Sequence, residues 1–190
     1  MGTIEREPLS FTTEPSPFGP FALIWEESEG RPRIRRILLS KPGLPAPKAV
    51  QDAFPAITSS TCTDINRLAD QIQRFLQGED IRFGLENTRL DLCSMFQQNV
   101  LRAEHRIPRG SISTYQRIAR HLSRPSCARA VGMALARNPF PIIIPCHRAI
   151  RGDRRLGGYQ GGPAMKRQLL EMEGVTFDDS GYVTAKTYFY

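Results

Sequence analysis

Two short apolar runs near the N-terminus, at 21–25 and 34–39, predict a pair of β-strands. The segment 29–32 between them reads Glu-Gly-Arg-Pro and has turn chemistry, so the two strands are expected to form a hairpin. From 63 to 77 the apolar positions recur at helical spacing and Gly78 follows, which predicts one helix. The pattern therefore predicts a small α/β unit with antiparallel strands.

Polar and proline-rich segments separate these elements. Residues 1–19 are rich in Pro, Thr and Ser and are expected to be irregular. Residues 41–60 contain four prolines and are expected to form a loop. The apolar segment 81–85 is expected to return as another strand. Nothing in this part of the chain resembles a catalytic constellation.

From about residue 89 the pattern changes to one helix after another. Apolar spacing predicts helices at about 91–104 and 126–137. Between them, Ser113 or Thr114 is suited to cap a helix that runs through Leu122. Two helices joined by a short turn, the second of them basic, are typical of a helix-turn-helix, although many helical hairpins share this pattern.

Length and composition fit one domain or two small ones. The 190 residues are 40% hydrophobic and 24% charged, which is ordinary for a globular protein, and no apolar run is long enough to span a bilayer. We place the domain boundary where the pattern changes, which gives a small α/β domain at 1–88 and a mostly helical domain at 89–190. The N-terminus lacks the features of a secretory signal, so a cytoplasmic protein is expected.

The charge of the chain is unevenly distributed. Between 101 and 170 there are fourteen Arg or Lys residues and two acidic ones, whereas the rest of the chain has twelve basic and seventeen acidic residues. Thirteen of those fourteen are arginine, the usual partner of phosphate. A solvated basic face gives the same count, but the segment favours an interaction with nucleic acid because it also holds the candidate reactive thiol.

That thiol lies in the stiff segment 138–148, where three prolines alternate with apolar residues and lead to Cys146, His147 and Arg148. Proline fixes its own φ and favours extended conformations in the residue before it. A thiol beside an imidazole and a guanidinium is expected to have a lowered pKa. The alternative is a buried strand that ends in a structural cysteine, since cysteine is among the most buried residue types.

The four cysteines lie far apart and form no C-x-x-C pair, so neither a disulfide scaffold nor a zinc site is expected. The first sixty residues contain no cysteine or histidine. No metal site is therefore predicted.

The chain resembles a known family in three motifs. They are Asn138-Pro139, Pro145-Cys146-His147-Arg148, and Gly157-Gly158-Tyr159-Gln160-Gly161-Gly162. All three are similar to motifs of the O6-alkylguanine-DNA alkyltransferases, also called methylated-DNA–protein-cysteine methyltransferases, and the similarity runs almost without gaps from about 107 to 175. It implies a ribonuclease-H-like α/β N-terminal domain followed by a mostly α, winged helix-turn-helix-like domain.

The resemblance also implies a reaction. The family transfers an alkyl group from O6 of guanine, and also from O4 of thymine, in flipped-out duplex DNA to a cysteine. Here that cysteine is Cys146, with His147 as a base acting through water and Glu173 orienting His147. From the residues alone, Glu171 and Glu173 are equivalent helix-end acids.

Other site residues are matched to the family in the same way. Tyr115 would rotate the nucleotide and hydrogen-bond the leaving guanine, although a core tyrosine fits the helical pattern as well. Asn138 would serve as a hinge between the recognition helix and the active-site segment. The implied guanine pocket consists of Leu135, Pro141, Ala149, Tyr159 and Gln160.

The resemblance implies that the helix at 126–137 enters the minor groove of double-stranded DNA containing O6-alkylguanine. Its small residues permit close approach to DNA, or alternatively tight packing against a neighbouring helix. Arg129 would act as a wedge in the base stack, and its alternative is a phosphate contact. Arg137 stands where many relatives have glycine. The implied DNA-binding residues are Tyr115, Ala128, Arg129, Ala130, Gly132 and Arg137.

A thioether leaves no bond for water to cleave, so each molecule is expected to react once, as a suicide enzyme that requires no cofactor. A monomer associated with the nucleoid of a prokaryote is expected, without a membrane partner. One competing interpretation is a damage sensor that binds alkylated DNA without accepting the group, against which Cys146 argues. A second is a cysteine hydrolase using Cys146 and His147, which would need an oxyanion hole and would show turnover on an ester.

Overall fold

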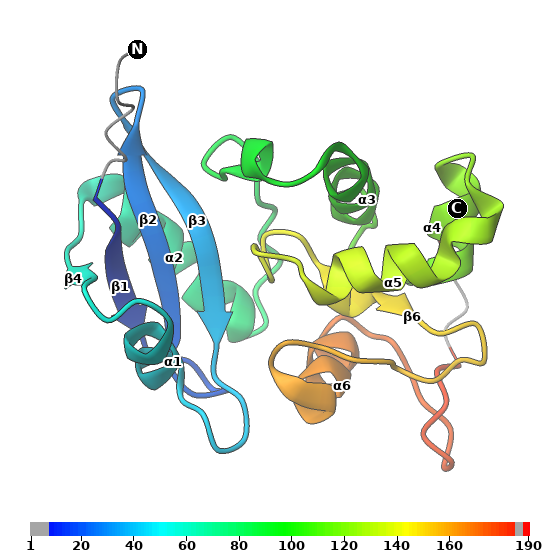
Figure 1. Ribbon diagram of the computed structural model, residues 1–190. Helices are drawn as coiled ribbons and strands as arrows, with labels where there is room; N and C mark the ends of the chain where they lie inside the picture. The colour runs from blue at the N-terminus through cyan, green and yellow to red at the C-terminus, as the bar shows by residue number, and fades with distance from the viewer. Residues whose placement is uncertain (1–7, 185–187) are drawn as a thin grey trace.

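The computed structural model describes residues 8–184 and 188–190. A four-stranded sheet with a helix on each face forms its first part, and the second part is mostly helical (Figure 1). The elements of the sheet part are β1 (Ser10–Glu14), β2 (Phe21–Ser28), β3 (Arg31–Leu39), α1 (Ala46–Ala53), β4 (Thr58–Ser59) and α2 (Thr63–Leu76). The strand order is β3-β2-β1-β4, with β1 antiparallel to β2 and parallel to β4.

The predicted hairpin is confirmed, and its strands are longer than the apolar runs. β2 and β3 pair antiparallel, and Glu29 and Gly30 connect them with φ values of 56° and 72°, as a two-residue hairpin turn requires. Because helices cover both faces of the sheet, β2 is buried on both sides. Ala22 and Ile24 pack with α1, whereas Leu23 belongs to the core shared with α2.

Three predictions for this part were wrong. β1 lies in a segment expected to be irregular, because its Thr-rich sequence carries little apolar signal and its pairing with β2 supplies the stability. α1 lies in the segment expected to be a loop, and its proline occupies the first turn, where a missing N–H costs no helical hydrogen bond.

The third error is the strand expected at 81–85, which is irregular in the structure. Its alternating side chains do pack against the core, but the free edge of β3 is already occupied. Ile37 N–H donates to the carbonyl of Pro139 at 2.8 Å, and Ile34 N–H donates to the carbonyl of Asn87. The segment 81–85 therefore does not pair with β3, although its apolar side chains alternate as in a strand.

The helical part confirms the predicted helices, with boundaries shifted by a few residues. Its elements are η1 (Leu90–Leu92), α3 (Met95–His105), β5 (Ser113–Thr114), α4 (Tyr115–His121), η2 (Pro125–Cys127), α5 (Ala128–Ala136), η3 (Cys146–Arg148), β6 (Ala149–Ile150) and α6 (Gly162–Met172). Thr114 caps α4, since its hydroxyl accepts a hydrogen bond from Arg117 N–H at 3.2 Å. α3 starts later than predicted, at the residue after its cap, Ser94.

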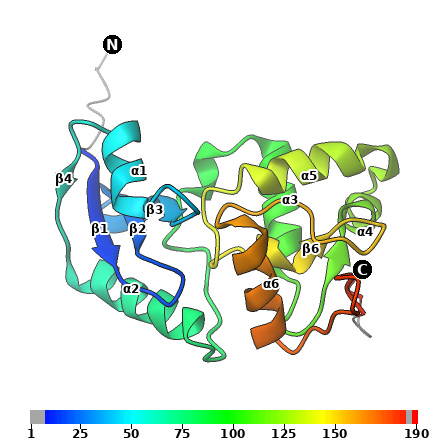
Figure 2. The same cartoon turned by 90° about the horizontal axis from the view of Figure 1, so that it is seen from below.

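The segment between α5 and η3 lies where the sheet part and the helical part meet (Figure 2). Phe140, Ile142, Ile143 and Ile144 are at most 2% exposed and belong to the same apolar core as β2, β3 and α2. This burial fixes the position of Cys146, which follows directly. In the described ranges, no helix has the length and apolar character needed to cross a membrane.

Candidate active site

Asn138 holds the two ends of the proline-rich segment together. Its side-chain NH₂ donates to the carbonyl of Ile144 at 2.9 Å, and its side-chain oxygen accepts from Phe140 N–H at 2.9 Å. The side chain is buried, so both bonds are shielded from water. Between them Ile142 has a φ of 75°, a left-handed conformation that is unfavourable for a β-branched residue. The segment is therefore held in one strained conformation that leads from α5 to Cys146.

Cys146 opens onto a cavity of about 560 Å³. Cys146 is the first residue of η3 and is only 8% exposed. α5 also lines the cavity, through Ala128, Arg129 and Gly132 among others. This volume is in the range of small-molecule sites, which suits an enclosed ligand of the size of a nucleobase.

Behind Cys146 lies a buried cluster of His147, Arg148 and Glu173. His147 Nε2 and Glu173 Oε1 are 2.9 Å apart, and Arg148 donates to both carboxylate oxygens at 2.9 and 2.7 Å. Although burial raises the pKa of Glu173, His147 and Arg148 bring that pKa down to about 2. Glu173 is therefore ionised at neutral pH and fixes the proton of the imidazole on Nε2.

The other imidazole nitrogen, Nδ1 of His147, is buried and has no hydrogen-bond partner in the part of the chain that the structure describes. Desolvation lowers the pKa of His147, against an opposing effect of Glu173, so the ring is neutral at pH 7. A neutral imidazole that donates through Nε2 has its lone pair on Nδ1. This nitrogen is the free proton acceptor of the cluster.

The expected lowering of the Cys146 pKa is wrong. Burial raises the pKa of the thiol to about 11, and the side chain of Asn138 opposes this only in part. The guanidinium of Arg148 does not act on the thiol, since it binds Glu173 and the carbonyl of Ile107. Although Arg148 is close to Cys146 in the sequence, its charge is therefore paired with Glu173 and not with the thiol.

Tyr115 reaches the cavity from the start of α4. Its ring lies against Gly132, and its hydroxyl lies so close to Gly157 that a Cβ at that position would come within 2.6 Å of it. Gly157 also has a φ of 72°, which favours glycine. Burial raises the pKa of Tyr115 to about 12, so the phenol is a hydrogen-bond donor at neutral pH.

The structure brings most of the predicted residues to this cavity, but not all. Leu135, Asn138, Tyr159 and Gln160 line it together with Cys146 and Tyr115. Pro141 and Ala149 are buried and do not line it, Ala130 lies on the exposed surface of α5, and Arg137 lies beyond the C-terminal end of α5.

Gln160 connects the pocket to the sheet. Its side-chain oxygen accepts from Leu39 N–H at 2.8 Å, and its NH₂ donates to the carbonyl of Ile37 at 3.4 Å. The edge of β3 therefore positions the loop that carries Tyr159. Sequence reasoning assigned Gln160 to the pocket but could not foresee that the sheet holds it.

With this geometry established, comparisons with known proteins agree in pointing to one family. The family model of the DNA-binding domain of 6-O-methylguanine DNA methyltransferase matches residues 95–175. A methylated-DNA–protein-cysteine methyltransferase of Archaeoglobus fulgidus is 38% identical over 134 residues, which are 67% of this chain and 87% of that protein. The chain belongs to the methylated-DNA–protein-cysteine methyltransferase family.

Other members of this family cover different shares of the chain. The protein of that name from Methanothermobacter thermautotrophicus is 44% identical over 120 residues, 63% of this chain and 67% of that protein. The one from Mycobacterium leprae is 45% identical over 104 residues, 54% of this chain and 61% of that protein. The solved structure of Mycobacterium tuberculosis OGT in complex with DNA has a TM-score of 0.68 at 33% identity, covering 87% of this chain and 93% of the other.

Sequence reasoning missed two buried charged residues beside the methyltransferase site. Lys166 on α6 is fully buried and donates to the carbonyls of Ala149 and Gly158, at 2.6 and 3.4 Å. Glu104 on α3 is also fully buried. Both occupy positions on the apolar face of their helices, Lys166 between Met165 and Leu169. A charged residue within a helical apolar stripe was the available signal.

Proposed function

We propose that this protein repairs DNA by transferring an alkyl group from O6 of guanine to the sulfur of Cys146. The observation that carries the proposal is one cavity lined by Cys146, Tyr115 and residues of α5. His147 follows Cys146 in the chain, and its buried Nδ1 has no hydrogen-bond partner among the described residues. The names of the relatives, and the solved complex of M. tuberculosis OGT with DNA, support the same activity.

In the proposed reaction the Cys146 sulfur attacks the alkyl carbon, the S–C bond forms and the C–O6 bond breaks. The proton of the thiol moves to His147 Nδ1 through a water molecule, and the Glu173 carboxylate stabilises the resulting imidazolium. The electron pair of the broken bond goes to guanine, which accepts a hydrogen bond at N3 from the Tyr115 hydroxyl and takes up one proton from water, while the His147 imidazolium returns its proton to water. The raised pKa of Cys146 makes this assisted deprotonation necessary.

The product of this step is a thioether, which water does not hydrolyse. Among the described residues all four cysteines are free, and Cys146 forms no disulfide. Each molecule therefore accepts one group and remains alkylated. O4 of thymine offers the same alkyl–oxygen bond and belongs to the proposed substrates.

The same proposal assigns DNA binding to the helical part, as a winged helix-turn-helix-like domain behind a ribonuclease-H-like sheet domain. α5 would lie in the minor groove, where Ala128, Ala130 and Gly132 allow close approach and Arg129 fills the space of the extruded nucleotide. Arg129 is exposed at the rim of the cavity, as a wedge requires. We expect the protein to act as a monomer, in the cytoplasm on nucleoid DNA.

The decisive experiment is intact-peptide mass spectrometry after incubation with a duplex containing O6-methylguanine. The peptide that bears Cys146 should become heavier by one methylene, in a stoichiometry of one group per protein molecule. Cys62, Cys93 and Cys127 are the internal controls and should stay unmodified. An unchanged mass together with intact DNA binding would favour a damage sensor, and continued release of product from one copy would favour a turnover enzyme.

A further inference from the structure

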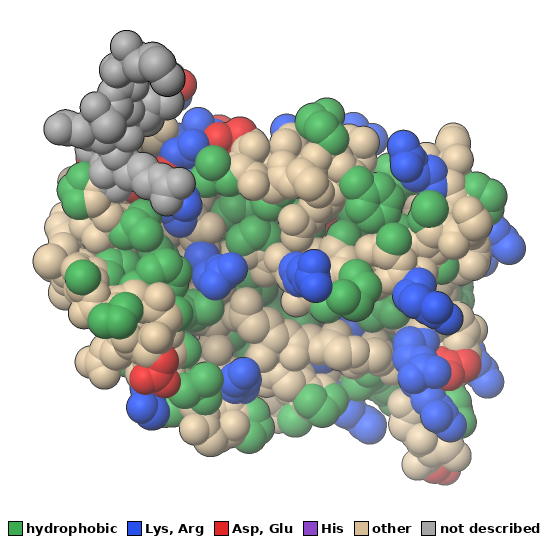
Figure 3. Space-filling model, viewed as in Figure 1, with side chains coloured by type: hydrophobic (Ala, Val, Ile, Leu, Met, Phe, Trp, Pro, Cys, Tyr) green, Lys and Arg blue, Asp and Glu red, His purple; other side chains and the backbone are tan. Residues whose placement is uncertain are grey.

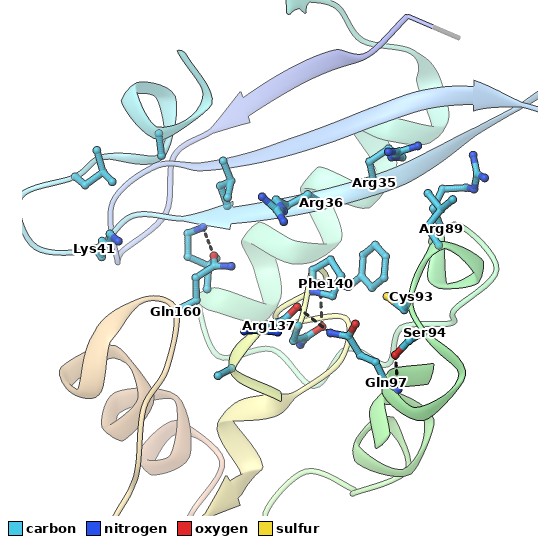
Figure 4. Close-up of a pocket in the computed structure, with 18 residues that line it drawn as sticks. Arg35, Arg36, Lys41, Arg89, Cys93, Ser94, Gln97, Arg137, Phe140 and Gln160 are labelled. Atoms are coloured by element: carbon cyan, nitrogen blue, oxygen red, sulfur yellow. Dashed lines mark hydrogen bonds between the residues drawn. The ribbon is translucent and has the colours of Figure 1, made fainter. Parts of the chain in front are cut away.

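A second cavity, of about 510 Å³, lies beside the catalytic one. It is bounded by β3, by the start of α3 and by the turn that follows α5 (Figure 4). Ala136, Asn138 and Gln160 line both cavities, so the two share part of a wall. The residues that the proposed mechanism uses leave this second cavity unexplained.

Its lining is strongly basic. Among the residues that the structure describes, five cationic side chains line it and no carboxylate does: Arg35, Arg36, Lys41, Arg89 and Arg137. Two of them are neutralised from outside the cavity, since Arg35 and Arg89 both contact Glu26 and Arg89 also pairs with Asp91.

The other three cations are exposed and form no ion pair within the described residues: Arg36, Lys41 and Arg137. In Figure 4, Arg36 on β3 and Arg137 beyond α5 lie on facing sides of the cavity, with Gln160 toward one end and Arg89 toward the other. Figure 3 shows that Lys and Arg side chains extend over this face from the sheet part to the helical part, with few acidic side chains among them. Like charges gathered without partners repel one another, so such a surface is stabilised by a polyanion.

The chemistry of the walls indicates phosphate recognition and not base recognition. Phe140, the aromatic residue of the lining, is fully buried and offers no face for a base to stack on. The exposed groups are guanidinium and ammonium, which bind phosphate oxygens.

The place of the cavity relative to α5 suggests which phosphates these are, a step that rests on the proposed function. α5 has nine residues and is about 13 Å long, whereas one turn of DNA is about 34 Å, so a duplex bound on α5 extends past both of its ends. If the duplex runs along α5, the flank that leaves at the C-terminal end of the helix would meet Arg137 and Arg36, which line the cavity there. The other flank would leave toward η2, which contributes no residue to the cavity lining.

We propose that this basic cavity binds the phosphate backbone of DNA on one side of the lesion, and so gives the protein a preference for lesions with duplex on that side. The sheet part, through β3, is then a component of the DNA-binding surface. The recognition helix would read the lesion, while the cavity would hold the flank.

The experiment uses two duplexes of equal length, about two helical turns (~20 bp). Each carries O6-methylguanine about five base pairs from one end, at the 5′ side in one duplex and at the 3′ side in the other. The double variant Arg36→Ala, Lys41→Ala is compared with the protein itself and with Arg31→Ala. Arg31 is an exposed arginine at the start of the same strand and does not line the cavity, so it controls for loss of charge.

For one of the two duplexes, the double variant should lose about tenfold in affinity, and its slope of log K against log salt should flatten by about 0.9 per lost phosphate contact. Affinity for the other duplex, and alkyl transfer from free O6-benzylguanine, should stay unchanged. The Arg31→Ala protein should show neither effect.

Equal losses on both duplexes, or losses matched by Arg31→Ala, would overturn the proposal, because a diffuse charge effect would explain them. A change in the number of protein copies per duplex, with the affinity of a single copy intact, would overturn it in favour of contact between copies. Failure of the proposed function itself is distinguishable, since the unaltered protein would then transfer no group from either duplex or from the free base.

Discussion

Two carboxyl groups are buried in the helical part of this protein, and their surroundings differ. Glu173, at the end of α6, shares three contacts of hydrogen-bond length with His147 and Arg148. Within the described residues, neither carboxyl oxygen of Glu104, on α3, has a partner at normal hydrogen-bond geometry, although the backbone of Ala149 lies near enough to oppose the rise in its pKa. The pKa of Glu173 falls to about 2 in spite of its burial, whereas burial raises the pKa of Glu104 to about 8 against the charges of Lys166 and Arg148.

This difference teaches that burial alone does not decide the charge of a group near the site. A carboxylate with well-oriented cationic donors keeps its charge, and one without them retains its proton. Glu173 can therefore stabilise an imidazolium on His147, whereas Glu104 is neutral up to about pH 8. The following predictions test this contrast, starting from the largest effect.

Glu173→Gln should destabilise the protein by about 3–5 kcal/mol, because it leaves the buried guanidinium of Arg148 without its counter-charge. Transfer from free O6-benzylguanine should slow as well, although Gln keeps an oxygen for His147 Nε2–H. Urea denaturation and the transfer rate measure the two effects. Glu171→Gln is the matched control, since Glu171 is exposed and pairs with Arg167 at i,i+4, and should cost less than about 0.5 kcal/mol. Similar losses in both variants would contradict the special environment of Glu173.

Arg129→Ala tests an exposed charged residue, in contrast to the buried carboxyl groups of Glu173 and Glu104. Transfer from duplex DNA should slow by about a hundredfold, the equivalent of a few kcal/mol of base extrusion, while transfer from the free base is unchanged. The unfolding free energy should not move. Arg120→Ala, an exposed arginine of α4, is the control. Equal slowing on duplex and free base would refute the wedge role.

The pH dependence of transfer tests the partner of Glu173. Between pH 7 and 9 the rate with free base should change less than about threefold, because neutral His147 takes the proton of the thiol within the protein. In His147→Ala the thiolate must form by loss of the proton to solvent. Its rate should then rise about tenfold per pH unit, since this range lies below the raised pKa of Cys146. Parallel profiles for the two proteins would exclude His147 as the base.

Glu104→Gln should change the pH dependence of stability. The folded pKa of Glu104 is raised, so between about pH 4.5 and 8 the folded state keeps a proton that the unfolded state releases, and stability falls as pH rises. This loss, about 1.4 kcal/mol per pH unit at most, should be absent from the variant. Above pH 8 the lowered pKa of Lys166 reverses the sign, since stability then rises with pH. Urea denaturation at pH 5, 6, 7 and 8 measures the difference, and curves parallel to those of the unaltered protein would contradict it.

The sequence predicted the elements whose side-chain pattern is strong. The β2–β3 hairpin, α2 and the helices around the site follow from apolar spacing and turn residues, which act over a few neighbouring positions. It failed at β1, at α1 and at 81–85, where the outcome depends on which segment occupies a strand edge. Pro139 took the edge of β3 that 81–85 would have needed.

The site divides in the same way. The order Pro-Cys-His-Arg and the glycines around Tyr159 are properties of the sequence, and through them the resemblance located the thiol. The sequence alone also determined the basic segment and its arginines. The direction in which neighbouring side chains point is not encoded locally. Arg148, two residues after Cys146, therefore binds Glu173 and not the thiol.

Only the tertiary structure decided the charge states of the site residues and their hydrogen-bond partners. Whether a thiol, an imidazole or a carboxyl is charged depends on desolvation and on donors brought from distant positions, such as Arg148 to Glu173, or Gln160 to β3. Desolvation and hydrogen bonding depend on all the groups that surround a side chain in space, whereas side-chain order and periodicity are properties of the chain itself. For that reason the reacting atoms were found in the sequence, and the means of activating them only in the fold.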